Sequence, residues 1–192
     1  MAKVISDGVG AFYQHYPRVA TIVTAQAKGK ANAMAVAWHM SISFNPPLYG
    51  VSIASKRFTY QLIADSREFG VNFLPFEAAE LVASVGGSKG EEVDKFRRFN
   101  IATDKSVKTK VPILEAAYAA YECKLVDDRD YGDHRLLVGE IVAVHQMKEA
   151  FTSDEVIDLD KVSPILYLGH ELYVTASRDI VRSLDREVYG KR

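Results

Sequence analysis

The sequence is poor in cysteine and almost balanced in charge. Its single cysteine, Cys123, excludes an intramolecular disulfide, and because it lies in an apolar segment we interpret it as a small buried hydrophobic residue. The chain has 24 basic side chains (Lys and Arg) against 25 acidic ones, a formal net charge of −1. Such a chain has no general field to gather nucleic acid or bind an anionic membrane, so we expect neither partner.

Long apolar runs are also absent from the sequence. No stretch approaches the roughly 20 residues of a membrane-spanning helix, and the first twenty residues lack the continuous apolar region of a signal peptide. We therefore predict a cytoplasmic protein in a reducing compartment. No set of His, Cys or carboxylate residues has the spacing of metal ligands, which predicts that no metal is bound.

Nothing in the sequence divides the chain into parts. It contains no repeat, no low-complexity segment and no linker rich in Pro, Gly and Ser, and 192 residues suffice to bury a substantial core. We predict one domain over residues 1–192, with a core of about 16–176 and a tail of 177–192 that ends in a basic tip.

Apolar and β-branched segments separated by short turns predict a mainly β fold. The expected strands are 18–25, 31–43, 48–54, 69–74, 116–126, 134–146 and 165–174, and the expected short helices are 57–64, 77–85 and 91–99. Most connections are too short for the crossovers of a parallel sheet. We therefore expect a β-barrel with short helices, in which residues 127–133 join the two longest strands.

The strand expected over 31–43 has two contrasting faces. Its large apolar residues occupy even positions, at Met34, Val36, Trp38, Met40 and Ile42, and small or polar residues occupy the odd ones. Period-two alternation of this kind marks a strand with different neighbours on its two sides. We expect the large residues to fill a core. The small face would let a planar ring lie close to the backbone, although small residues also alternate with large ones simply to fit the taper of a barrel.

The segment Ser55-Lys56-Arg57-Phe58-Thr59 opens the helix expected next. Hydroxyl groups, two cationic side chains and the free amides of a helix start together suit a phosphate group. The alternative is that Ser55 only caps the helix while Lys56 and Arg57 form a solvated face. Gly86-Gly87-Ser88-Lys89-Gly90 is not a phosphate-binding P-loop, because its spacing differs and it follows a helix.

Taken together in order, the motifs resemble the flavin reductase-like, FMN-binding split-barrel proteins, most closely the flavoredoxin-like branch. The resemblance runs from about Tyr16 to Tyr173. Its pieces are VATIVTA (19–25), NAMAVAW (32–38), SISFNPP (41–47), SKRFT (55–59), FGVNFL (69–74), DKF (94–96), Gly132-Asp133-His134 with Gly139, and Tyr167-Leu168-Gly169 before Tyr173.

This resemblance implies a six-stranded Greek-key barrel that forms a homodimer, with one FMN per subunit near the interface. FMN is expected in preference to FAD. The phosphate would lie against Ser55, Lys56 and Thr59, and the charge of Arg57 supports that position. The ring and ribityl chain would lie along Asn32, Met34, Ala35, Val36, Ala37, Trp38, His39 and Ser41. Trp38-His39 stands where many reductases of the family that exchange free flavin carry Ser-Phe, so we expect a retained FMN.

His134 is the candidate catalytic residue. It follows Gly132-Asp133 at the start of a strand, where the resemblance implies a histidine that faces the flavin and orients a nicotinamide or bonds the reduced ring. Taken alone, a histidine at a strand end is more often an ordinary surface residue.

The sequence thus predicts an FMN-binding oxidoreductase of the flavin reductase or flavoredoxin type. Electrons would pass from NAD(P)H, or from a redox partner protein, through FMN to flavin, ferric or protein acceptors. The alternative is a non-enzymatic split-barrel carrier of haem or flavin, with His39 or His134 as a haem ligand. A barrel that binds nucleic acid or a protein without any cofactor is the least favoured, since basic and aromatic residues are not clustered.

Overall fold

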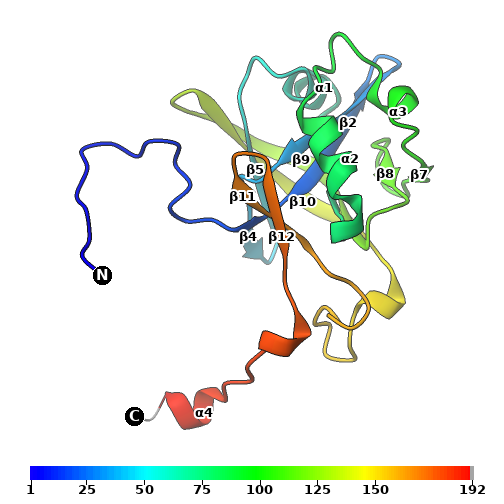
Figure 1. The fold of residues 1–192 in the computed structure, drawn as a ribbon. Coiled ribbons are helices and arrows are strands. Elements are labelled where there is room, and N and C mark those ends of the chain that lie inside the picture. The colour runs from blue at the N-terminus through cyan, green and yellow to red at the C-terminus, as the bar shows by residue number, and fades with distance from the viewer. Residues whose placement is uncertain (191–192) are drawn as a thin grey trace.

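The computed structural model describes residues 1–190 and is a mainly β structure (Figure 1). The strands are β1 (Arg18–Val19), β2 (Thr21–Ala27), β3 (Lys30–Val36), β4 (His39–Phe44), β5 (Pro47–Ile53), β6 (Glu68–Phe73), β7 (Thr103–Asp104), β8 (Ile113–Leu114), β9 (Ala119–Tyr131), β10 (His134–Gln146), β11 (Ile165–Gly169) and β12 (Leu172–Thr175). The α-helices are α1 (Phe58–Ser66), α2 (Ala79–Gly86), α3 (Lys95–Arg98) and α4 (Arg186–Tyr189), with short 3-10 helices at Phe76–Ala78, Lys148–Ala150 and Arg178–Ile180. The basic tip expected at Lys191 and Arg192 lies outside the described residues.

One antiparallel sheet forms the body of the molecule, in the strand order β3-β2-β6-β9-β10-β5-β4. Two smaller sheets, β1-β11-β12 and β7-β8, flank it. The hairpin expected around Lys28-Gly29-Lys30 is present, and it sets Met34 opposite Val23. If β3 and β4 are counted as two halves of one segment, six strands make the wall, which agrees with the mainly β, split-barrel fold expected from the sequence.

The strand expected over 31–43 is in fact divided, because the chain changes its hydrogen-bonding partner midway. β3 pairs with β2, whereas β4 pairs with β5. The expected core face is therefore wrong in its second half: Met40 and Ile42 are 51% and 40% exposed. Val36 is buried as expected.

The barrel interior is filled by apolar residues from the strands and from α1. Phe69, Ile53, Leu137 and Ile63 are fully buried in one cluster. Gly139 is required there, because a Cβ at that position would come within 2.6 Å of the Phe69 ring. A second cluster lies between β2, β3 and α2 and contains Val82 and Val85 of the helix expected over 77–85.

Other boundaries also differ from those expected. The turn placed over 127–133 shrinks to Gly132 and Asp133, because β9 and β10 continue their ladder to Tyr131 and His134. Gly132 supplies the positive φ of 70° that this two-residue connection needs. The helix expected over 91–99 is only α3, which Asp94 caps by accepting a hydrogen bond from the Arg97 amide.

Helix α1 begins directly after Arg57, which occupies the cap position and makes no side-chain cap bond. Ser55 therefore does not cap it, contrary to one of the two interpretations above. The strand expected over 165–174 is a hairpin, interrupted where His170 and Glu171 adopt positive φ. Within residues 1–190 no helix is long and apolar enough to cross a membrane.

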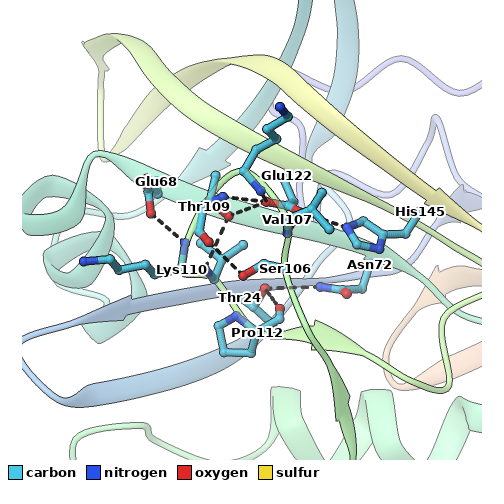
Figure 2. A network of polar contacts seen from close by, with 12 residues as sticks. Thr24, Glu68, Asn72, Ser106, Val107, Thr109, Lys110, Pro112, Glu122 and His145 are labelled. Atoms are coloured by element: carbon cyan, nitrogen blue, oxygen red, sulfur yellow. Dashed lines mark hydrogen bonds and ion pairs between the residues drawn. The ribbon is translucent and has the colours of Figure 1, made fainter.

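A buried carboxylate fixes the loop before β8 to the barrel wall (Figure 2). Glu122 of β9 is fully buried and accepts hydrogen bonds from the amides of Val107, Lys108 and Thr109 at 2.7–2.9 Å. The Thr109 hydroxyl and His145 Nε2 donate to it as well. This network ties the loop to β9 and β10 and is structural.

Candidate functional site

Two adjoining cavities form a groove between β3 and the segment that contains α2 and the loop after it. The first, here called the tyrosine cavity, has a volume of about 560 Å³. The second, the basic cavity, has a volume of about 510 Å³. The cavities share Ala35 and Gly86, so they lie next to each other along β3, and they are together called the groove. In Figure 1, α2 lies across the strands of the barrel, with α1 and α3 toward one end of it.

The small residues of β3 explain why the groove exists. Ala33 is fully buried in the cluster that includes Val82 and Val85 of α2. Ala35 lies beside Gly86, where an added Cβ would meet the Ala35 methyl at 3.4 Å. The small face is thus partly covered by α2 and partly open: Ala35 and Ala37 line the tyrosine cavity, whereas Ala33 does not.

The tyrosine cavity is lined on its other side by aromatic residues of the β11–β12 hairpin. Tyr167 and Tyr173 pack with their ring centroids 5.2 Å apart. The remaining lining is apolar or small, apart from Glu171. This end of the groove suits a planar, largely apolar group.

The basic cavity contains three of the four residues that the sequence predicted to lie against a phosphate. Lys56 and Arg57 are exposed at its mouth, and Thr59 is buried at the start of α1. Ser55 is exposed and does not line it. No acidic residue occupies the first turn of α1, so the amides there are not compensated by a carboxylate.

Asn32 occupies the floor of the basic cavity and is 3% exposed. Its Nδ2 donates to the Thr59 hydroxyl at 2.8 Å. Its Oδ1 is the one buried side-chain polar atom of the described residues that lacks a hydrogen-bond partner. An unsatisfied buried acceptor is costly, so this atom suits a donor group on a ligand.

Lys95 is a functional candidate to which the sequence analysis assigned no role. Its side chain is 3% exposed and lines the basic cavity, where Nζ donates to the carbonyl oxygens of Ala33 and Val85 at 2.9 and 2.7 Å. An ammonium group has three donors, and no carboxylate of the described residues forms an ion pair with this one. Burial, together with the charge of Arg57, lowers the pKa of Lys95 to about 8.

A buried ammonium without a counter-ion, close to Arg57, is an arrangement that an anion stabilises. The signal available in the sequence was the position of Lys95 directly after a capping aspartate and before Phe96, within the DKF motif. Periodicity alone could not show that its side chain points inward.

Several residues expected along the ring do not line the groove. His39 points into the barrel, where Nδ1 lies 2.6 Å from the Tyr49 hydroxyl and Nε2 lies 2.8 Å from the Val19 carbonyl oxygen. Burial lowers the pKa of His39. Ser41 is exposed on the edge strand β4. Met34 and Val36, by contrast, line the basic and the tyrosine cavity respectively.

Trp38 and His134 lie together, outside the lining of both cavities. Their ring centroids are 4.8 Å apart, and Trp38 Nε1 donates to the Tyr16 hydroxyl at 2.9 Å. His134 Nδ1 lies 2.8 Å from the Asp133 carboxylate. Hydrogen bonding to His134 lowers the pKa of Asp133. A catalytic role for His134 stays a prediction.

The described residues contain no group of three or more His, Cys, Asp or Glu side chains that could hold a metal ion. The groove presents three features: a buried cation and an unsatisfied amide oxygen in the basic cavity, and alanine and tyrosine side chains in the tyrosine cavity. Such a groove can hold an elongated ligand with an anionic end and a planar end.

Comparisons with known proteins agree with this chemistry. The chain is 34% identical to an FMN-binding protein from Thermus thermophilus, solved with bound p-hydroxybenzaldehyde; the match has a TM-score of 0.84 and covers 95% of this chain and 100% of that one. It is 27% identical to the flavoredoxin from Methanosarcina acetivorans, with a TM-score of 0.83, over 95% of this chain and 96% of that one.

Among curated relatives, the ferric-chelate reductase (NAD(P)H) of Archaeoglobus fulgidus is 30% identical over 131 residues, which are 67% of this chain and 76% of that protein. Residues 13–175 match the flavin reductase like domain. The match spans the whole barrel and both sides of the groove, and the chain therefore belongs to the flavin reductase-like family of split-barrel proteins.

Proposed function

We propose that this protein is an FMN-dependent oxidoreductase in which the groove holds the flavin. The flavin phosphate would lie in the basic cavity, and the ring would lie in the tyrosine cavity against Ala35 and Ala37. The observation that carries the proposal is the buried Lys95 ammonium in the basic cavity, which has two carbonyl partners and no counter-ion. The tyrosine cavity at the other end of the groove is lined by small and aromatic side chains.

The residues of the groove would bind and orient the flavin. Lys95, Thr59 and the amides of the first turn of α1 would hold the phosphate. Asn32 Oδ1 would accept a hydrogen bond from a hydroxyl of the ribityl chain, which satisfies an acceptor that otherwise stays buried and unpaired. The alanines of β3 would exclude water from one face of the ring. The bound flavin supplies the redox chemistry, so no nucleophile is required of the protein.

The proposal also includes the electron donor and the electron acceptor. We propose NAD(P)H as the donor, with support from the relative named ferric-chelate reductase (NAD(P)H). A relative of 34% identity was solved with 1-cyclohex-2-enone and with p-hydroxybenzaldehyde, which supports small planar acceptors in addition to flavin, ferric complexes and redox partner proteins. A haem carrier that uses His39 as the ligand is less favoured, because both ring nitrogens of His39 are already bonded.

The experiment compares FMN with riboflavin, which lacks the phosphate. Apoprotein is titrated with each flavin, and binding is followed by quenching of flavin fluorescence. The Lys56→Ala/Thr59→Ala and Lys95→Met variants should weaken FMN binding by about 10- to 100-fold, since charge-assisted hydrogen bonds contribute about 1.5–3 kcal/mol each. Riboflavin binding should change little in the same variants.

Lys110→Ala is the matched control, because Lys110 is exposed and lies outside the groove. It should leave both affinities unchanged. A wild-type protein that binds neither flavin, or variants that retain FMN as tightly as the wild type does, would contradict the proposal. Anaerobic addition of NADH or NADPH to the FMN complex then tests the donor: bleaching of the flavin band is expected with at least one of them.

A further inference from the structure

The tyrosine cavity is lined by one charged residue to which the proposed function gives no role. Among the described residues that line this cavity, Glu171 is the only Asp, Glu, Lys or Arg. The rest of the lining consists of Tyr167, Tyr173, alanines, valines and glycines. Glu171 is exposed and forms no ion pair within residues 1–190. An otherwise uncharged cavity therefore has a single carboxylate at its rim.

Glu171 lies in the two-residue turn that joins β11 to β12. His170 and Glu171 adopt φ angles of 48° and 61°, in the left-handed region where glycine or asparagine is usual. The turn is held from both sides. The Glu171 amide donates a hydrogen bond to the Tyr167 hydroxyl at 3.3 Å, and the His170 ring packs against Tyr13 with centroids 5.3 Å apart. The backbone that carries the carboxylate is therefore fixed beside the Tyr167 ring.

The charge of Glu171 acts on the wall of the cavity. Burial, the neighbouring Tyr167 and the Glu171 carboxylate, in this order, raise the pKa of Tyr173. The same charge repels an anion in the cavity and attracts a cation, because methyl groups and aromatic rings offer no opposing charge. Since Glu171 itself is exposed to solvent, the effect is a preference and not a complete exclusion.

We propose that Glu171 is a specificity-determining residue, which makes the tyrosine cavity prefer neutral or cationic planar substrates to anionic ones of the same shape. The inference rests on the proposed function, in which the flavin ring lies against Ala35 and Ala37. A ring in that position leaves the opposite wall of the cavity, with its tyrosines and Glu171, to a second planar molecule. The carboxylate is then on the side from which this second molecule is held.

Three small molecules of nearly the same planar shape test the proposal. At neutral pH benzamide is uncharged, benzoate is an anion and benzamidine is a cation. Each is titrated into the FMN complex of the wild type and of the variants. Binding is followed by the change that it causes in the flavin absorption band, so that only a molecule next to the ring is detected.

We expect the wild-type complex to bind benzamidine most tightly and benzoate least tightly. Glu171→Gln should lower the ratio of the benzoate to the benzamidine dissociation constant about three- to tenfold, and should leave the benzamide constant within about twofold. Glu171→Lys should reverse the preference, because it places a cation at the same position.

Glu80→Gln is the matched control. Glu80 is an exposed residue of α2, the helix that supplies Val82 and Ala83 to the cavity, but it does not itself line the cavity. Its substitution should leave the ratio of the two constants unchanged. Raising the salt concentration to about 1 M, where the Debye length is about 3 Å, should bring the wild-type ratio close to that of Glu171→Gln, whereas a purely steric role would not depend on salt.

The same ratio in the wild type, Glu171→Gln and Glu171→Lys would overturn the inference. So would an equal change in Glu80→Gln, or a wild-type FMN complex that binds benzoate as tightly as benzamidine or binds none of the three molecules. Failure of the wild-type protein to form an FMN complex at all would instead overturn the proposed function.

Discussion

At the scale of single residues, two buried charged side chains differ in whether the protein itself satisfies their charge. Glu122 is a buried anion with five hydrogen-bond donors, supplied by the 107–109 segment and His145, and it is fully satisfied (Figure 2). Lys95 is a buried cation with two carbonyl partners and no anion. The first arrangement stabilises the fold by itself, whereas the second is completed by a ligand.

Glu122→Gln should destabilise the protein by about 2–4 kcal/mol. The neutral side chain loses the charge-assisted hydrogen bonds, and its NH2 group faces N–H groups of the protein that are themselves donors. Urea denaturation followed by circular dichroism measures this free energy. Glu68→Gln is the matched control, because Glu68 is only partly buried and its carboxylate accepts a hydrogen bond from the Lys110 amide alone. This substitution should lower the free energy of unfolding by well below half as much as Glu122→Gln does. Equal decreases in the free energy of unfolding in the two variants would show that the buried network stabilises the fold no more than a single exposed hydrogen bond does.

The same carboxylate predicts an acid-sensitive stability. Burial alone would raise the pKa of Glu122, but the bonds from Val107, His145, Lys108 and Thr109 lower it to about 2, from an ordinary value of 4.5. The stabilisation is therefore fully present above pH 4.5 and is lost as the pH falls toward 2, by about 3 kcal/mol at most. In Glu122→Gln the free energy of unfolding should fall less steeply with pH over this window.

Lys95 predicts a pH dependence of ligand binding in the opposite range. Its pKa of about 8 in the free protein means that the ammonium loses its proton as the pH rises through 8, whereas a bound phosphate favours the charged form. Between pH 7 and 9.5, where the FMN phosphate stays ionised, FMN affinity should therefore fall as the pH rises through about 8. Lys95→Arg, whose side chain stays charged, should bind with an affinity independent of pH from 7 to 9.5; a wild-type profile that is also flat would refute the role of the amine.

Gly90 illustrates a residue whose importance no local pattern reveals. A Cβ at this position would overlap the amide of Asn32, so only glycine lets the loop lie directly on it. Gly90→Ala should cost about 1–3 kcal/mol of stability and displace the loop. In an Asn32→Ala background the same substitution should cost much less, because the clash is gone; equal costs in both backgrounds, by a double-mutant cycle in urea, would contradict this explanation.

At the scale of elements, the sequence predicted most strands because alternation and turn residues act locally. The hairpin of β2 and β3, strand β6 and the two long strands were recognisable in this way. The division of 31–43 was not, since hydrophobic alternation continues unchanged from Met34 to Ile42 while the hydrogen-bonding partner switches from β2 to β5. A change of partner is a property of the sheet and leaves no local signal.

Some residues of the candidate site were likewise predictable from the sequence and others were not. Asn32, Ala35, Lys56, Arg57 and Thr59 were predicted from motif order, and the structure brings all five to the groove. His39 was misplaced because β4 turns its side chain toward Tyr49, and Lys95 received no role because a lysine in a charged segment is ordinarily exposed. Motif order thus indicated which segments meet at the groove, but it did not show which side chains face it: Trp38 and Ser41 lie in motifs and do not line the groove, whereas Lys95 of the DKF motif does.

At the scale of the whole molecule, apolar side chains are exposed on one edge of the sheet. Met40, Ile42 and Phe44 of the edge strand β4 are 51%, 40% and 99% exposed. The two ends of the chain extend away from the barrel as arms (Figure 1), and they carry further exposed apolar residues, among them Val4 and Ile180. Contiguous apolar surface of this kind on an edge strand is typical of an interface.

We therefore expect the protein to be a homodimer in which β4 and the arms cover one another. Sedimentation at micromolar concentration should give about twice the mass of one chain, and an Ile42→Asp/Phe44→Asp variant should sediment as a folded monomer, because two carboxylates cannot be buried unpaired. Val126→Asp, a change at a residue of β9 that is 50% exposed, is the matched control and should leave the dimer intact. If the monomeric variant retains FMN with wild-type affinity, each groove is complete within one chain; if FMN is lost, the partner subunit closes it. A wild-type protein that sediments as a monomer would leave the exposed edge of β4 without a role in assembly.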